Sequence, residues 1–158
     1  MKFLIAVFAI SFVAANELPK KFLGTWDIED SVNFDEYLTA KGYNWFMRVL
    51  IRKSHVAKVF AKNEDGTYTA EILTQTKSAH WNGWRLDLPF DALYLDEEMH
   101  RITFSYNNAT DVFSETHKTL EHESPDENCL YTINEAGRLV MEIEFGGVKS
   151  QRFYAKKE

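Results

Sequence analysis

Cysteine is almost absent from this chain of 158 residues, which contains only Cys129. An intrachain disulfide is therefore impossible, so the fold must be held by its hydrophobic core alone. Proline is scarce as well, with three residues, whereas aromatic residues make up 15% of the chain. This composition excludes a disulfide scaffold and a low-complexity chain, and it predicts one compact globular domain.

Basic residues are too few for a typical nucleic-acid-binding protein. The chain has 18 lysines and arginines against 24 aspartates and glutamates, which gives a formal net charge of −6. A surface with an excess of negative charge repels a phosphate backbone. We therefore expect no nucleic-acid partner.

Long apolar runs are missing except at the start of the sequence. Residues 1–15 read MKFLIAVFAISFVAA, with one lysine before an apolar stretch that ends in small residues. This arrangement is typical of a secretory signal peptide, and the stretch is too short for a membrane span. The sequence thus predicts a signal peptide at residues 1–15, a single domain at residues 16–158, and a secreted, extracellular protein.

Catalytic motifs are also missing. The sequence contains no Gly-x-Ser-x-Gly nucleophile elbow and no His-Glu-x-x-His zinc motif. His117 and His122, with Glu115 and Glu121 nearby, could form a metal or acid–base group, but their spacing matches no firm ligand motif. A lone cysteine such as Cys129 more often packs than reacts. We therefore expect no enzyme activity, no metal and no cofactor.

The apolar pattern changes from strand to helix early in the chain. Residues 22–29 alternate between apolar and polar side chains and predict a first strand that begins at Phe22. Asn33 followed three residues later by Glu36 forms a capping-box pattern, which predicts a helix start. Gly42 marks the end of this first helix.

A second helix is predicted at residues 45–53, with Asn44 as its N-cap. A helix that covers a core needs only one apolar stripe, but this helix is apolar on more than one face. The excess favours contact with something apolar beyond the core, such as a ligand, a membrane or a protein partner. Burial in a small core explains the same pattern equally well.

From residue 55 onward, the sequence shows only short strands and turns. The expected strands lie at residues 56–62, 68–74, 79–88, 102–106, 113–120, 130–133 and 139–145, followed by a closing strand. Their spacing predicts an antiparallel barrel or sandwich, and direct hairpin links favour the up-and-down barrel. Closure also removes the exposed sheet edges that a protein without disulfides tolerates poorly.

The closing strand follows a predicted tight turn at Gly146-Gly147. Alternation places Ser150, Arg152 and Tyr154 on one face, together with Val148. If this face points into a closed sheet, the buried guanidinium needs an anion, and a carboxylate fits its planar fork and the tyrosine hydroxyl. We therefore expect Arg152 and Tyr154 to bind the head group of an organic acid. An exposed arginine on a solvated face is the alternative.

These segments resemble the fatty-acid-binding protein family. The residues that carry the resemblance are Phe22-Leu23-Gly24-Thr25-Trp26, Asn33-Phe34-Asp35-Glu36-Tyr37-Leu38, and Arg152-Phe153-Tyr154 near the end. Two short helices and a run of strands lie between them, so the match spans nearly the whole chain after residue 15. Lipocalins share the Gly-x-Trp of the first strand but lack a helix pair directly after it. With its signal peptide, the chain is similar to the secreted fatty-acid-binding proteins of nematodes.

The resemblance implies an all-β fold, a ten-stranded antiparallel up-and-down β-barrel (β-clam) with a two-helix lid between the first and second strands. It also implies that Arg152 and Tyr154 hold the ligand carboxylate in an internal cavity. The expected ligand-tail or portal residues come from the helices: Phe34, Tyr37, Leu38, Trp45 and Phe46. The expected ligands are long-chain fatty acids or retinoids, carried by a monomer whose lid contacts membranes transiently.

Two features depart from the family pattern. Many members have a second arginine, here expected near Tyr131, but no lysine or arginine occurs between Lys118 and Arg138. We therefore expect Arg152 to be the only strong cation inside the barrel, assisted by Tyr154 and water. The family's portal phenylalanine also has no clear match near Lys77. A protein-interaction module that docks through the second helix is the alternative function, and a lipid-modifying enzyme is a weaker one.

Overall fold

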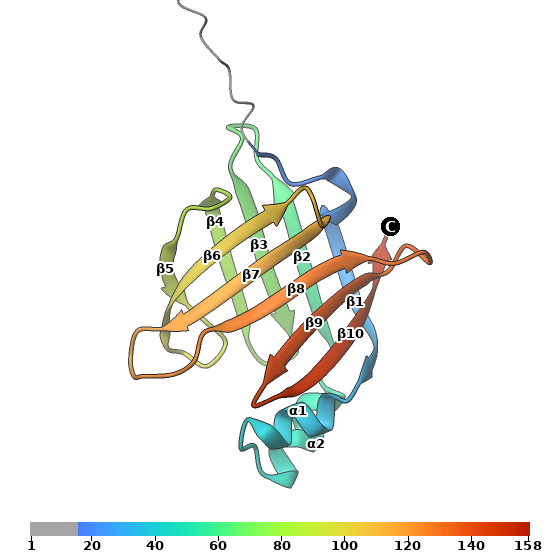
Figure 1. Ribbon diagram of the computed structural model, residues 1–158, viewed down its shortest axis with the longest axis vertical. Coiled ribbons are helices and arrows are strands. Elements are labelled where there is room, and N and C mark those ends of the chain that lie inside the picture. Colours follow the sequence, from blue (N-terminus) through green and yellow to red (C-terminus); the bar gives the residue numbers. More distant parts are fainter. Residues whose placement is uncertain (1–15) are drawn as a thin grey trace, which may run out of the picture.

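The computed structural model describes residues 16–158, so the signal peptide predicted at residues 1–15 lies outside the described residues. Ten antiparallel strands form a nearly closed barrel with two helices at one end (Figure 1). The strands are β1 (Gly24–Val32), β2 (Val56–Lys62), β3 (Tyr68–Thr74), β4 (Ser78–Trp84), β5 (Phe90–Leu93), β6 (Met99–Asn107), β7 (Val112–Thr119), β8 (Glu127–Ile133), β9 (Leu139–Phe145) and β10 (Val148–Lys157). The helices α1 (Phe34–Ala40) and α2 (Trp45–Lys53) connect β1 to β2. The predicted fold is confirmed.

The barrel closes through the pairing of its first and last strands. The order of the strands is β4-β3-β2-β1-β10-β9-β8-β7-β6-β5. Within residues 16–158, no ladder joins β4 to β5, and this position is called the seam below. The indole of Trp81 on β4 spans the seam and donates a hydrogen bond to the backbone oxygen of Leu93, at 3.1 Å.

The closing hairpin has the predicted geometry. Gly146 and Gly147 have φ angles of 57° and 80°, which glycine adopts without steric cost. The turn pairs Val148 with Phe145 and thereby sets the register of β9 and β10. Ser150, Arg152 and Tyr154 are consequently buried on the inner face, as predicted.

The two helices start in different ways. Asn44 is extended, and its side chain accepts a hydrogen bond from the Met47 backbone N–H at 3.0 Å, which confirms the predicted cap of α2. The capping box predicted at Asn33 and Glu36 is wrong, because Asn33 has a left-handed conformation and its side chain accepts no cap bond. Gly42, with a φ of 85°, follows the end of α1 as expected.

The chain before β1 also differs from the prediction. Phe22 was expected to begin the first strand but ends a short 3₁₀ helix, η1 (Lys20–Phe22), directly after Pro19. Its backbone oxygen accepts a hydrogen bond from the indole of Trp26 at 2.9 Å. Its ring packs against Tyr106 and Phe113, with centroids 5.9 and 5.7 Å apart. The segment that carries η1 lies at the end of the barrel opposite the helices (Figure 1), and the Phe22 ring is fully buried in the core there.

Aromatic rings form most of the core behind Phe22. Phe60, Phe104 and Phe113 contact one another edge-on or stacked, and Trp84 stacks on Phe104 at 4.1 Å. Such pairs contribute stability beyond that of the area that they bury.

Among residues 16–158, no helix has the length and apolar content that a membrane crossing requires.

Candidate functional site

Arg152 and Tyr154 lie inside the barrel wall on β10. The Arg152 side chain is 8% exposed, and its guanidinium lies 4.3 Å from the centre of the Phe34 ring and 5.7 Å from that of Tyr154. Its Nε donates to the Ser31 hydroxyl at 3.4 Å. Within residues 16–158, no carboxylate forms an ion pair with Arg152, and the Tyr154 hydroxyl is buried without a hydrogen-bond partner. The pair thus offers a cation and a hydroxyl that the described chain leaves free.

A bulge in β1 and the start of α1 shape the surroundings of Arg152. The β1–β10 register shifts between Ile28 and Asp30, which places Ser31 directly opposite Arg152. Arg152 lines a cleft with a volume of about 590 Å³ between the end of β1, α1 and the end of α2. The other lining residues are Ile28, Glu29, Asp30, Ser31, Asn33, Phe34, Asp35, Glu36, Arg52, Lys53, Ser54 and His55. The guanidinium is therefore reached from the helical end of the barrel.

The inner face of α1 covers this region. Phe34, Tyr37 and Leu38 are all buried, and α1 packs on β10 and β9. Burial raises the pKa of the Tyr37 hydroxyl well above its usual value, and the negative charge of Glu127 raises it further. Tyr37 therefore stays protonated and can donate a hydrogen bond at neutral pH.

The structure separates the predicted helix residues into two groups. Trp45 is 69% exposed and Phe46 is 62% exposed, and no residue of α2 is buried. These side chains lie on the outer surface, whereas Phe34, Tyr37 and Leu38 face the barrel. The apolar excess of the second helix is thus a surface property in this structure and does not come from core packing.

A second buried cation, Lys58, contradicts the expectation that Arg152 is the only one. Lys58 points inward from β2, where its Nζ donates to the Tyr131 hydroxyl at 2.6 Å and lies 3.3 Å from Glu115 Oε2. Tyr131 in turn donates to the same Glu115 oxygen. His117 Nε2 lies 2.5 Å from the other oxygen of Glu115. These four residues, Lys58, Glu115, His117 and Tyr131, are called the crosspiece below.

The crosspiece joins opposite walls of the barrel. Lys58 belongs to β2 and Glu115 to β7, and four strands separate β2 from β7 in the sheet order. Burial alone raises the pKa of Glu115, but the charge of Lys58 and the hydrogen bonds from His117 and Tyr131 hold it well below its usual value. Burial alone lowers the pKa of Lys58, yet the Glu115 carboxylate keeps it above its ordinary value. Glu115 and Lys58 therefore form a charged pair.

The sequence contained a signal for Lys58 that the prediction missed. Val56 and Phe60 flank it at spacing two, and both are buried on the inner face of β2. The alternation that placed Arg152 inside also places Lys58 inside. Among residues 16–158, the buried charged side chains of the interior are therefore Lys58, Arg152 and Glu115, and Arg152 is the one without an ion-pair partner.

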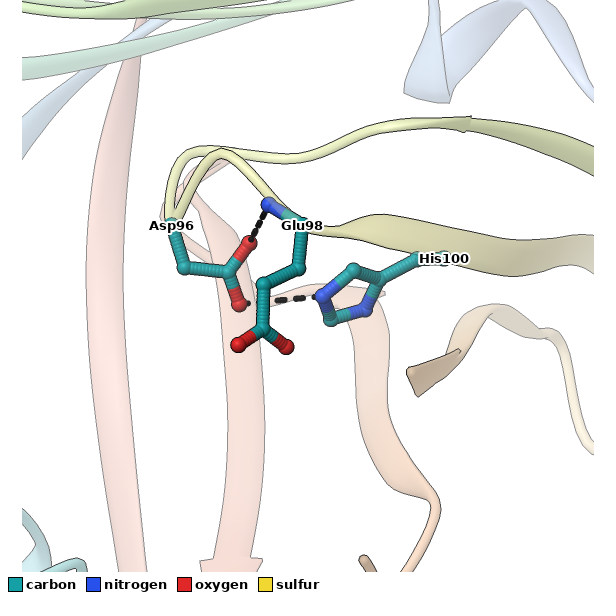
Figure 2. A group of neighbouring side chains, drawn as sticks. All are labelled: Asp96, Glu98 and His100. Carbon is teal, nitrogen blue, oxygen red and sulfur yellow. Dashed lines mark hydrogen bonds and ion pairs between the residues drawn. The ribbon is translucent and has the colours of Figure 1, made fainter. Parts of the chain in front are cut away.

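The structure does not bring His117 and His122 together. His117 is buried in the crosspiece, whereas His122 lies in the loop after β7, 3.4 Å from Glu98. A different group, Asp96, Glu98 and His100, gathers at the β5–β6 turn with its potential ligand atoms within 4.8 Å of one another (Figure 2). His100 Nε2 lies 2.9 Å from Asp96 Oδ2. Thr119 donates to Glu98 at 2.9 Å, so internal hydrogen bonds already use much of this group.

Comparisons with known proteins show relatives that cover most of the chain. The chain is 43% identical over 150 residues to "Fatty acid-binding protein homolog 3" of Caenorhabditis elegans, covering 94% of this chain and 89% of that protein. It is 37% identical over 148 residues to the "Fatty acid-binding protein homolog" of Ascaris suum, covering 92% and 90% of the two chains. No family model matches the chain.

Solved structures give the same result. The structure of "As-p18, an extracellular fatty acid binding protein" has a TM-score of 0.84 and 36% identity to this chain, covering 90% of this chain and all of that one. A Schistosoma mansoni fatty acid binding protein in complex with arachidonic acid has a TM-score of 0.70 at 17% identity, covering 87% and 97% of the two chains. At that low identity, the likeness concerns the fold alone.

Proposed function

Because this chain belongs to the fatty-acid-binding protein family, we propose that it is a secreted carrier of long-chain fatty acids, with the carboxylate held by Arg152 and Tyr154. The observation that carries the proposal is the unneutralised guanidinium on the inner face of β10. A buried cation without an anion is costly, and a fatty-acid carboxylate supplies that anion. The same site accepts a retinoid that ends in a carboxylate.

The acyl tail supplies most of the affinity. Each buried methylene contributes about 0.8 kcal/mol, so a long chain gains on the order of 10 kcal/mol before ordering costs. Phe34, Tyr37 and Leu38 on the inner face of α1 are apolar surfaces for this tail. A charge-assisted bond to Arg152 adds about 1.5–3 kcal/mol. Chain length therefore sets the affinity, and Arg152 with Tyr154 sets the orientation and the preference for acids.

The decisive experiment compares a fatty acid with the alcohol of the same chain length. We expect Arg152→Ala to weaken binding of the acid by roughly 10- to 100-fold and to leave the alcohol nearly unchanged. Arg138→Ala is the matched control, because Arg138 lies 4.9 Å from the Phe153 ring on the outer face. Equal losses for acid and alcohol would refute the carboxylate role.

Secretion is supported by the composition of residues 1–15 and by the similarity of the chain to As-p18, an extracellular fatty acid binding protein. The first described residues are anchored to the barrel. Asn16 donates to the Tyr106 backbone oxygen at 2.7 Å, and the Leu18 side chain is buried. A mature chain that starts near Asn16 therefore keeps these contacts. N-terminal sequencing of protein collected from the medium tests this, and an intact Met1 in secreted protein would contradict it.

The outer face of α2 suits transient contact with an anionic membrane. Trp45, Phe46 and Leu50 are exposed there, and Arg48, Arg52 and Lys53 accompany them. We expect Trp45→Ser with Phe46→Ser to slow fatty-acid transfer to anionic vesicles. Leu93→Ser, at an exposed leucine on β5, outside α2, is the control. Transfer rates that do not depend on vesicle concentration or on anionic lipid content would instead favour a protein partner for this face.

A further inference from the structure

Two buried histidines outside the carboxylate site have the same unusual arrangement. His100 on β6 is 7% exposed and His117 on β7 is 3% exposed, and the Nδ1 atom of each is buried without a hydrogen-bond partner among the described residues. Buried unsatisfied polar atoms are rare in native proteins, and each costs about 1–3 kcal/mol. Because two such atoms lie on adjacent strands, we treat them as one candidate binding site.

The strand register brings the two histidines together. Ile102 pairs with His117 and His100 pairs with Thr119, so the histidines are diagonal neighbours on the inner face. Their ring centroids are 5.8 Å apart. The two rings are therefore neighbours on the same part of the inner face.

Carboxylates fix which nitrogen of each ring carries the proton. His100 Nε2 bonds Asp96 (Figure 2), at a distance of 2.9 Å, and His117 Nε2 lies 2.5 Å from Glu115. A carboxylate only accepts, so Nε2 must donate in each pair. In a neutral imidazole, this leaves Nδ1 as a hydrogen-bond acceptor. As neutral imidazoles, the two histidines thus present acceptors that have no donor among the described residues.

The surroundings select the class of donor. The Tyr94 ring lies 4.3 Å from the His117 ring and 5.1 Å from the His100 ring, and the Trp81 ring lies 5.8 Å from His117. These aromatic rings favour an apolar molecule with one hydroxyl. A structural zinc ion needs about four N, S or O ligands, whereas here Asp96 and Glu115 are turned to the opposite nitrogens.

We propose that His100 and His117 form a second polar subsite in the barrel, which accepts a hydrogen bond from a hydroxyl group on the acyl chain of the ligand. The preferred ligand class is then a hydroxylated long-chain fatty acid, and this proposal rests on the proposed fatty-acid carrier function. Tyr94 now covers both rings. Tyr94 lies just after β5, which pairs only with β6, and borders a groove of about 380 Å³ along the seam, so its side chain has room to shift.

The test uses octadecanoic acid and a series of hydroxyoctadecanoic acids whose hydroxyl moves along the chain, all measured by calorimetry in EDTA. We expect at least one isomer to bind about 3- to 10-fold more tightly than the parent acid. The other isomers bury an unpaired hydroxyl and bind more weakly than the parent. If every isomer binds more weakly, the subsite is refuted while the fatty-acid site stands; if the parent acid itself fails to bind, the proposed function fails as well.

Variants decide whether the histidines cause the preference. His117→Phe and His100→Phe should each abolish it and leave the parent acid bound. His100→Phe is the safer variant, because its partner Asp96 is about half exposed, with 48% of its side chain accessible. His80→Phe is the matched control, since His80 bonds Glu71 at 2.7 Å but lies on the outer face. A preference that survives both variants, or one that needs added zinc, would overturn the proposal.

Discussion

The crosspiece predicts that Glu115→Gln destabilises the protein strongly through Lys58. Lys58 is buried, and its Nζ lies 3.3 Å from Glu115, which is the only carboxylate paired with it in the described chain. The substitution keeps the shape of the side chain but removes the charge. Breaking a buried pair by removing one partner typically costs about 3–5 kcal/mol, because the remaining ion is left in a low dielectric. We therefore expect this loss in the free energy of unfolding, measured by urea titration.

The matched variants separate the charge from the packing. Lys58→Met removes the stranded cation, so the double variant Lys58→Met/Glu115→Gln should recover most of the stability that Glu115→Gln loses. Asp91→Asn is the surface control. Asp91 accepts two hydrogen bonds from Arg101, at 2.8 and 2.9 Å, but this pair is exposed, and we expect little measurable effect.

Thermal unfolding should agree with the urea titration. For a domain of this size, each kcal/mol shifts the Tm by about 2–4 °C, so Glu115→Gln should lower it by roughly 6–20 °C. The argument is refuted if Glu115→Gln is no more costly than Asp91→Asn. It is also refuted if the losses of the two single variants simply add in the double variant, because coupling between the charges would then be absent.

Three further predictions follow from single groups. Because the pKa of Glu115 is lower in the folded protein than in the unfolded chain, Glu115 contributes its full stability above the unfolded pKa of about 4.3. This contribution is lost as the pH falls towards the folded pKa. The free energy of unfolding should therefore fall more steeply with decreasing pH in the wild type than in Lys58→Met/Glu115→Gln. Burial, with the Glu115 charge, raises the pKa of the Cys129 thiol to about 12, so Ellman's reagent at pH 8 should label it only as fast as the protein unfolds, and rapid labelling of the folded protein would contradict this. Asn44→Ala should cost about 1 kcal/mol, whereas Asn33→Gly should be neutral or stabilising, because only Asn44 makes a cap bond; equal losses in urea titrations would refute the distinction.

The sequence predicted the barrel well wherever alternation was regular. The β9–β10 hairpin combines two glycines with clean period-two patterns, so its turn, register and inner face could all be predicted. The strands β2 and β3 likewise have the predicted bounds. In each of these cases local pattern and tertiary burial agree, which is the condition for a reliable prediction.

The strand β5 could not be found in this way. A single strand was expected at residues 79–88, but β4 ends at Trp84 and a separate strand follows at Phe90–Leu93. Only four residues long, β5 pairs on one side alone, so its own pattern is weak. Asp87 has a φ of 62°, an uncommon conformation outside glycine, and its residue type gave no firm signal of the break.

The site was predicted from one strand at a time, and this explains what was missed. Arg152 and Tyr154 share a strand, so alternation alone placed them together. Lys58, Glu115 and Tyr131 lie on β2, β7 and β8, and the contacts among them exist only because the barrel closes. The family pattern predicted a second cation near Tyr131 in the sequence, whereas Lys58 reaches that tyrosine from the opposite wall.

The crosspiece also bears on which lipid the interior selects. Glu115 neutralises Lys58, so Arg152 leaves the interior with one excess positive charge. A single carboxylate cancels this charge, whereas a neutral alcohol or ester leaves it in place at the full cost of a buried ion. If Lys58 had no carboxylate partner, two cations would compete for one head group, and the ligand could bind in two orientations. In the proposed carrier, Glu115 would therefore act on selectivity without touching the ligand. It pairs with Lys58 and leaves Arg152 as the only buried lysine or arginine without a carboxylate partner among residues 16–158.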